Sequence, residues 1–289
     1  MVIKEGRKIL DYHIHPNFSI DAEGTVEAFC EAAIEKELKI ICFTTHVDTD
    51  PVRKDGVVRV ENNEIPTTDS AWLRPYATAI RDVARSYEDR QLEIRLGVEV
   101  DYYPGFQENL PKGFDEVDWD YVLGAVHLLE HKAISLEDEA DILFQRYSLN
   151  DLADLYYRTL VECAESGFFD VVAHIDIYRR YGEEFYGEDI RSIWRKHVSE
   201  LANAMCNEEV GFEVNTSSLR TGLSETMPTR DIVERLYKEG VDIVTVGSDA
   251  HSPQHVGYEI PTAFDILRDI GYEEVTIFRK RKPIDIAIK

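Results

Sequence analysis

Residues 9–15 read Ile9-Leu10-Asp11-Tyr12-His13-Ile14-His15, an apolar run that ends in two histidines. Six further apolar runs end on histidine, carboxylate or amide side chains, at residues 40–46, 96–99, 121–127, 169–174, 210–215 and 243–251. Six of the nine histidines therefore stand at the ends of strand-like runs. In barrels of parallel strands and helices, the carboxyl ends of the strands converge on one opening, where side chains carry chemistry. The pattern predicts an α/β barrel with a metal-lined opening.

The strand-like runs alternate with amphipathic stretches, which is typical of parallel βα units. We expect helices at residues 25–38, 71–90, 148–166, 190–208, 230–239 and 261–270. The count gives about seven inward strands, with 274–279 as a candidate extra strand. Two segments, 47–70 and 129–146, lack clear periodicity and directly follow candidate ligands. We expect these two segments to shape the substrate pocket.

Composition limits the class of protein. The chain has 289 residues, of which 44% are apolar, and we expect one domain over residues 1–289. Residues 1–8 lack the apolar stretch of a secretory signal, and no run approaches the roughly 18 apolar residues of a membrane span. We therefore expect a cytoplasmic protein without a membrane partner. The net charge of −24 would repel a nucleic acid. The four cysteines lack metal-site spacing, and we expect reduced core residues.

Two pairs of candidate ligands stand two residues apart, so each pair shares one face of its strand: His13 with His15, and Asp249 with His251. Glu99 ends a run in the middle of the set, where a lone buried carboxylate would be costly unless it is coordinated. Bridging two cations would justify that position. The predicted metal ligands are His13, His15, Asp21, His46, Glu99, His127, His174, Asp249 and His251. This set of nitrogen and oxygen donors suits divalent zinc, manganese or iron.

Three acids have alternative interpretations. Asp11 either accepts a hydrogen bond from a ligating imidazole or pairs with a buried lysine or arginine. Asp21 is either a ligand or a helix cap. Glu213 lies two residues before Asn215, which suggests that both side chains face the opening. Glu213 could be mistaken for a ligand, and its candidate roles are to support the ligands or to contact the substrate.

The ordered set of nine ligands resembles the PHP superfamily, the polymerase and histidinol phosphatase domains. This resemblance spans residues 11–255, and the segments 97–103 and 248–253 resemble its histidinol-phosphatase branch. It implies a distorted seven-stranded TIM-like barrel that holds up to three divalent metal ions. It also implies hydrolysis of L-histidinol phosphate in histidine biosynthesis. The segment 128–133 differs from that branch, which leaves other small phosphate esters and nucleotides open as substrates.

The resemblance also implies roles for the residues. The first metal would take His13, His15, Glu99 and Asp249; the second Glu99, His127 and His174; the third Asp21, His46 and His251. A water between the first two metals would attack phosphorus, and metal coordination can lower the pKa of such a water from about 15.7 to about 7. The candidate catalytic residues are Glu99, Asp249 and His251, with the proton donor to the leaving alcohol left open.

Planar guanidinium groups suit a phosphate better than an ammonium group does. Arg179 and Arg180 follow the run that ends at His174, and Arg220 follows the run that ends at Asn215. The resemblance implies that one arginine from each loop clamps the phosphate, and surface salt bridges are the alternative. We also expect Asn215 and His255 at the rim of the site.

Three other functions compete with a phosphomonoesterase. An amidohydrolase also opens with His-x-His but commonly bridges its metals with a modified lysine. A nuclease or nucleotide phosphoesterase of the same superfamily would prefer phosphodiesters and would use a basic groove. A metal store or sensor would use the same ligands without the arginines. We expect a small phosphorylated substrate, and the oligomeric state stays open.

Overall fold

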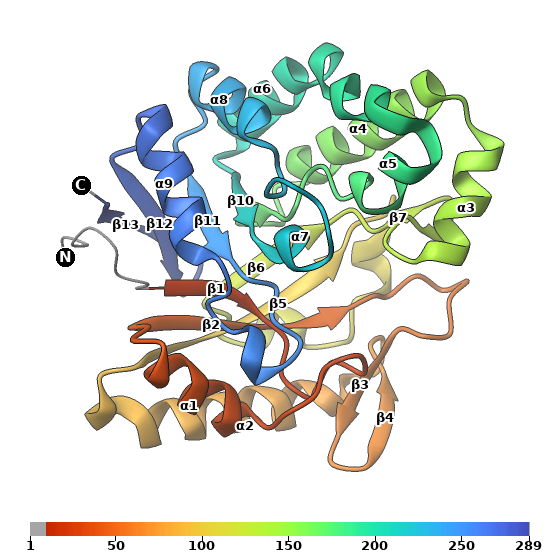
Figure 1. Cartoon of the computed structure of the whole chain (residues 1–289). Coiled ribbons are helices and arrows are strands. Elements are labelled where there is room, and N and C mark those ends of the chain that lie inside the picture. Colours follow the sequence, from red (N-terminus) through yellow and green to blue (C-terminus); the bar gives the residue numbers. More distant parts are fainter. Residues whose placement is uncertain (1–9, 289) are drawn as a thin grey trace.

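A barrel of parallel strands forms the centre of the computed structural model, which describes residues 10–288 (Figure 1). Its seven strands are hydrogen-bonded in the order β1-β2-β5-β6-β9-β10-β11. The first and last strands also meet, because the backbone N–H of His15 donates to the carbonyl of Ala250 at 2.9 Å. The barrel is therefore nearly closed. Its strands are β1 (Leu10–Ile14), β2 (Ile40–Val47), β5 (Glu93–Asp101), β6 (Tyr121–Ala125), β9 (Val171–Val172), β10 (Gly211–Asn215) and β11 (Val244–Gly247).

Each barrel strand falls within or overlaps one of the seven apolar runs, so the α/β barrel prediction is confirmed. Ile9, at the start of the first run, lies outside the described residues. All six predicted helices are also present: α1 (Val26–Glu35), α2 (Leu73–Tyr87), α4 (Leu149–Glu165), α6 (Val198–Glu208), α8 (Arg230–Lys238) and α9 (Ile260–Ile270). The expected helix at 190–208 is divided, because η5 (Gly187–Lys196) is a 3₁₀ helix that precedes α6.

The two segments without clear periodicity have secondary structure of their own. The first contains the antiparallel hairpin of β3 (Val57–Val60) and β4 (Asn63–Pro66). The second contains the short hairpin of β7 (Leu128–Leu129) and β8 (Lys132–Ala133), followed by α3 (Glu137–Arg146). Further short helices are η1 (Ser70–Trp72), η2 (Glu88–Arg90), η3 (Phe106–Asn109), η4 (Phe114–Glu116), α5 (Arg179–Tyr186), α7 (Ser217–Arg220) and η6 (Pro253–His255).

A carboxy-terminal hairpin covers the amino-terminal end of the barrel. It consists of β12 (Glu274–Arg279), the candidate extra strand, and β13 (Lys282–Ala287), which form a separate antiparallel sheet. The Tyr12 hydroxyl donates to the carbonyl of Phe278 at 2.7 Å and accepts from its N–H at 2.9 Å. In the turn, Arg281 pairs with Asp170 at 3.0 Å, just before β9. The opposite, carboxyl ends of the strands are therefore left for the site.

Two expectations from composition can be compared with the structure. Cys30, Cys42 and Cys163 are free and buried, as expected, whereas Cys206 on α6 is free but exposed. Within residues 10–288, no helix combines the length and the apolar character that crossing a bilayer requires.

Candidate metal centre

All nine predicted ligands lie at the carboxyl-terminal side of the barrel. His13, His46 and Glu99 stand on barrel strands, and the others follow one within the loops. Because the strands are parallel and adjacent, residues far apart in sequence meet at this end of the barrel. Their side chains form three groups of donor atoms.

The first group combines side chains from both edges of the barrel sheet, because β1 and the loop after β11 both contribute to it. The Nε2 atoms of His13 and His15 lie 2.8 Å apart, and each is 3.5 Å from Glu99 Oε2. Asp249 Oδ1 lies 3.6 Å from the first imidazole and 3.3 Å from the second. The Nδ1 of His13 faces the carboxylate of Glu213 at 2.8 Å and therefore donates to it, which leaves a lone pair on Nε2. A divalent cation fits between such convergent lone pairs and carboxylate oxygens.

The second group uses the other oxygen of the same glutamate. Glu99 Oε1 lies 3.0 Å from His174 Nε2 and 3.8 Å from His127 Nε2, and the two imidazole nitrogens are 3.2 Å apart. Asp101 Oδ1 accepts from Nδ1 of His127 at 2.5 Å, which turns Nε2 toward the group. The two oxygens of Glu99 therefore face different groups, as a bridging carboxylate requires.

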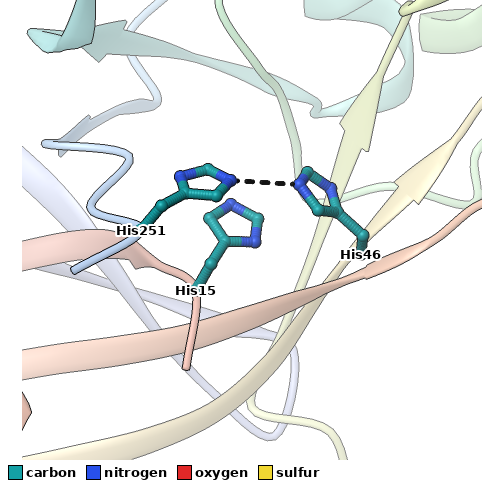
Figure 2. Close-up of side chains that lie close together, drawn as sticks. All are labelled: His15, His46 and His251. Carbon is teal, nitrogen blue, oxygen red and sulfur yellow. Dashed lines mark hydrogen bonds between the residues drawn. The ribbon is translucent and has the colours of Figure 1, made fainter. Parts of the chain in front are cut away.

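The third group is the most exposed. The Nε2 atoms of His46 and His251 lie 3.3 Å apart, and Asp21 Oδ2 lies 3.6 Å and 3.3 Å from them. Figure 2 shows these two imidazoles with the ring of His15 beside both. This third ring stacks on them, with centroids 4.1 Å and 4.2 Å away. A nitrogen lone pair lies in the plane of its ring, so a ring stacked on His46 and His251 does not aim its lone pair at the ion they would share. His15 therefore belongs to the first group, and Asp21 completes the third.

The carboxylates of these groups are ionised despite their burial. Burial opposes ionisation, but neighbouring histidines, above all His13, hold the pKa of Glu99 and of Asp249 well below the usual value. Glu99 Oε2 is buried and lies 2.8 Å from Nδ1 of His46, without the alignment of a hydrogen bond to any residue in the range 10–288. A buried, charged oxygen surrounded by the imidazole nitrogens of His13, His15 and His46 fits a metal ion, because ligating carboxylates must be deprotonated.

The two histidines of β1 differ in protonation. Burial holds the pKa of His15 well below its usual value, and the charges of His46 and His251 lower it further. Burial also lowers the pKa of His13, but Glu213 and other carboxylates outweigh this effect and hold it well above the usual value. A proton and a metal cation therefore compete for the imidazole of His13 in the first group.

Supporting carboxylates surround the ligands. Glu213 is buried, and besides His13 its Oε2 accepts from the backbone N–H of His174 at 3.3 Å and from Asn215 at 3.0 Å. Asp11 neither accepts a hydrogen bond from a ligating imidazole nor pairs with a lysine or arginine within residues 10–288, so both expectations were wrong. It accepts from the N–H of Ser248 at 2.8 Å and from the N–H of Gly257 at 2.7 Å, and so fixes the loop after β11.

Sequence reasoning missed Asp101 as a partner of a candidate ligand. The signal was present, because Asp101 lies two residues after Glu99 and so shares its face of β5. Its contact with His127, on the neighbouring strand's loop, depends on the register of β5 and β6, in which Asp101 is paired with Ala125.

A cavity of about 560 Å³ opens above the three groups. Arg180, Arg220 and His255 line it together with Glu99, His127 and Asp249. These positions agree with the expected clamp and rim.

Two residues that we expected to contact the substrate do not line the cavity. Arg179 is fully buried, and its guanidinium pairs with Asp176 and Glu183 instead. Asn215 is also fully buried, where it bonds to Glu213 and accepts from Ser217 at 2.9 Å. Both side chains face inward because neighbouring loops cover them.

Fold and site define an α/β barrel with a centre of histidines and carboxylates at its mouth. The model of the PHP domain matches residues 11–217, so the chain belongs to the PHP domain family, as the ligand order had indicated. A probable histidinol-phosphatase of Deinococcus radiodurans is 31% identical over 277 residues, covering 95% of this chain and 98% of its own. A histidinol-phosphatase of Lactococcus lactis is 24% identical and covers 95% of this chain and 96% of its own.

Solved structures agree on the fold. A crystal structure of histidinol phosphate phosphatase from Lactococcus lactis, complexed with zinc, L-histidinol and phosphate, superposes with a TM-score of 0.78. It covers 96% of this chain and all of its own, at 20% sequence identity. The putative histidinol phosphatase of Listeria monocytogenes gives a TM-score of 0.72, covering 88% of this chain and 99% of its own. The seven-stranded barrel predicted from the resemblance is therefore confirmed.

Proposed function

We propose that this protein is a metal-dependent phosphomonoesterase that hydrolyses L-histidinol phosphate to L-histidinol and inorganic phosphate. The observation that carries the proposal is the bridging geometry of Glu99, whose two oxygens face two separate sets of imidazoles. The names of the curated relatives, which align over nearly the whole chain, support the choice of substrate. The reaction would belong to histidine biosynthesis in the cytoplasm, with no nucleic-acid or membrane partner.

The donor groups suggest where three divalent ions would bind. His13, His15, Glu99 and Asp249 would hold the first, Glu99, His127 and His174 the second, and Asp21, His46 and His251 the third. When bound, zinc, manganese or iron would supply hydroxide from water at neutral pH and neutralise charge on the phosphate oxygens.

The remaining steps fall to side chains of the chain. A new bond from the water oxygen to phosphorus forms as the bond from phosphorus to the alcohol oxygen breaks, and the alcohol must then gain a proton. Asp249 and His251 both line the cavity and are the candidates for returning that proton. Glu99 would help to hold both the first and the second ion, so the water and the phosphate would meet in one orientation.

Arg180 and Arg220 would bind the phosphate. Arg220 donates through Nη1 to the carbonyl of Ser248 at 3.2 Å and through Nη2 to the carbonyl of Asp249 at 3.0 Å. These two bonds hold the guanidinium beside the loop after β11, which carries the candidate ligand Asp249. Each Nη atom has a second N–H, which remains for a phosphate oxygen.

The part of the cavity lined by Asp48, Arg53 and Asp55 favours a substrate that carries a positive charge. Arg53, whose side chain is 8% exposed, pairs with Asp48 at 3.2 Å, with Asp55, and with Glu139 at 2.6 Å. One guanidinium faces three acidic side chains, so this wall is negative even when Asp48, whose pKa is raised to about 7, carries a proton. The guanidinium also has few donors left for an anion. Histidinol carries an amine and an imidazole, which suit such a wall, whereas a nucleotide would add further negative charge.

The test begins with metal analysis of the purified protein and a phosphate-release screen. The screen compares histidinol phosphate with sugar phosphates, nucleotides, a phosphodiester and an amide substrate. We expect bound divalent ions and fastest release from histidinol phosphate. Glu99→Gln should lose metal and turnover, whereas Glu93→Gln, at the exposed start of the same strand, should keep both. Full metal content and turnover in Glu99→Gln would show that the bridging assignment is wrong.

A further inference from the structure

Arg179 is fully buried although it neighbours Arg180, which lines the cavity. Its guanidinium makes three contacts: with Asp176 Oδ2 at 3.1 Å, with Glu183 Oε1 at 3.0 Å and with the carbonyl of Thr226 at 3.0 Å. A buried guanidinium is costly to desolvate, and such contacts offset the cost.

Two of the bonds in this network connect different loops. Asp176 belongs to the loop after β9, whereas Thr226 belongs to the segment 216–229, which follows β10 and carries Arg220. Arg179 donates to the carbonyl of Thr226, and Asp176 Oδ2 accepts from the backbone N–H of Thr229 at 3.0 Å. The two residues therefore fasten the end of segment 216–229 to the loop that leads to Arg180.

The start of the segment is fastened independently. Asn215 Oδ1 accepts from the backbone N–H of Ser217 at 2.9 Å and from its hydroxyl at 2.6 Å. Arg220 thus lies between two fixed points, one on its own strand end and one on the neighbouring loop. Backbone bonds between Asn215 and Met227, at 2.7 Å and 2.9 Å, also close the segment onto β10, but among these contacts only the second point links it to the loop that leads to Arg180.

Stability is a weak explanation for this buried charge network. Asp176 Oδ1 and Arg179 Nη2 are buried and have no hydrogen-bond partner within residues 10–288, so the ion pair is only partly satisfied. Replacing a buried ion pair with apolar side chains of similar volume is often neutral or stabilising.

We propose that Arg179 and Asp176 are positioning residues, which hold segment 216–229 at the distance at which Arg180 and Arg220 grip one phosphate. This inference rests on the phosphate clamp proposed above. Arg179 does not line the cavity and acts only through its neighbours. A displacement of about 1 Å at a substrate-positioning group can cost about a hundredfold in rate, so a loosened segment would weaken both binding and turnover.

The experiment compares Arg179→Met and Arg179→Lys with Arg191→Met in the full-length, manganese-loaded protein. Arg191 is a matched control, because its ion pairs within residues 10–288 are with the same Glu183, at 2.6 Å, and with Glu188, at 3.3 Å, and neither partner belongs to segment 216–229. Three quantities are measured for each variant: the inhibition constant of inorganic phosphate, kcat/KM for histidinol phosphate, and hydrogen exchange of residues 216–229.

Arg179→Met should raise the phosphate inhibition constant and lower kcat/KM by tenfold or more, with faster exchange in the segment and unchanged metal content. The lysine variant should recover part of the loss, because an ammonium can pair with Asp176 but cannot reach all three partners at once. Arg191→Met should match the wild type. A lower melting temperature with wild-type phosphate inhibition and exchange would reduce Arg179 to a structural role and overturn the proposal.

Thr229→Pro tests the same connection if Arg179→Met does not fold. It removes the N–H that donates to Asp176, together with the threonine hydroxyl, which does not cap α8, and the φ of −60° at Thr229 already suits proline. It should loosen the segment and weaken phosphate inhibition; unchanged values would contradict the proposal. Absence of turnover in the wild type would refute the proposed function alone, since exchange of the segment still reports on the connection.

Discussion

Glu213→Gln is the most informative substitution, because Glu213 supports two candidate ligands at once. One oxygen accepts from Nδ1 of His13 at 2.8 Å, and the other accepts from the backbone N–H of His174 at 3.3 Å. Glutamine has nearly the same shape but only one acceptor oxygen, so its amide nitrogen must face one of these donors. The site has no spare room, since a Cβ at Gly247 would lie 2.3 Å from Glu213 Oε1.

The structure sets the size of the effect. One buried donor left unsatisfied costs about 1–3 kcal/mol of folding free energy. Loss of a carboxylate behind a ligating histidine typically weakens metal binding by about 10–100-fold, which corresponds to about 1.4–2.7 kcal/mol. Because Glu213 contacts the first and second groups together, we expect the upper part of that range.

Competition with a chromogenic chelator measures the affinity for zinc in wild-type and variant protein, and denaturant unfolding of the metal-free protein measures stability. Asp170→Asn is the control, because Asp170 is also a buried carboxylate but lies at the opposite end of the barrel. The control should lose stability and keep its zinc affinity. A zinc affinity of Glu213→Gln within twofold of the wild type would refute the reasoning.

Three further predictions concern the whole chain, the closing hairpin and the cavity wall. Removing the ions with a chelator should lower the melting temperature. Adding manganese at 100 times its dissociation constant should restore about 2.7 kcal/mol of folding free energy for each site. Identical melting curves with and without the ions would contradict the metal centre. Arg281→Ala should cost about 1–3 kcal/mol in denaturant unfolding and leave kcat unchanged, because it removes the ionic partner of Asp170 and a donor to the carbonyl of Phe168, both before β9 and away from the site. An altered kcat would show that the hairpin influences the site. Burial, with the nearby charge of Asp101, raises the pKa of Asp48 to about 7. The stability from this shift is complete below the unfolded-state value of 3.8 and is lost as pH rises to about 7. The free energy of unfolding of metal-free Asp48→Asn should therefore rise relative to that of the wild type from about pH 4 to about pH 7 and stay level above it. Parallel pH profiles of unfolding would count against that raised pKa.

Much of the barrel and of its ligand set could be predicted because both depend on local patterns. A strand exposes every second residue on one face, so His13 and His15 were recognisable as a pair before any tertiary contact was known. The apolar runs that end in such residues then located the opening. The third group was predicted from the resemblance, since nothing local distinguishes Asp21 from a helix cap.

The orientation of adjacent residues could not be predicted in the same way. Arg179 and Arg180 are neighbours in one loop, and only contacts from Asp176 and the Thr226 carbonyl turn the first inward. Asn215 does share the face of Glu213, but the following segment covers it. These outcomes depend on partners distant in sequence, which a single-sequence pattern does not contain.

The closure of the barrel has a consequence for how the protein is made. Tyr12 and Phe278 are bonded although they are 266 residues apart, and β1 meets the segment after β11. The first group of ligands likewise needs His13 from the beginning of the chain and Asp249 from near its end. Contacts of such long range form late, because the intervening loop must first be closed. On the proposed ligand set, a chain still on the ribosome would bind the first ion only after β11 and Asp249 have been made, and a fragment released earlier would lack that site.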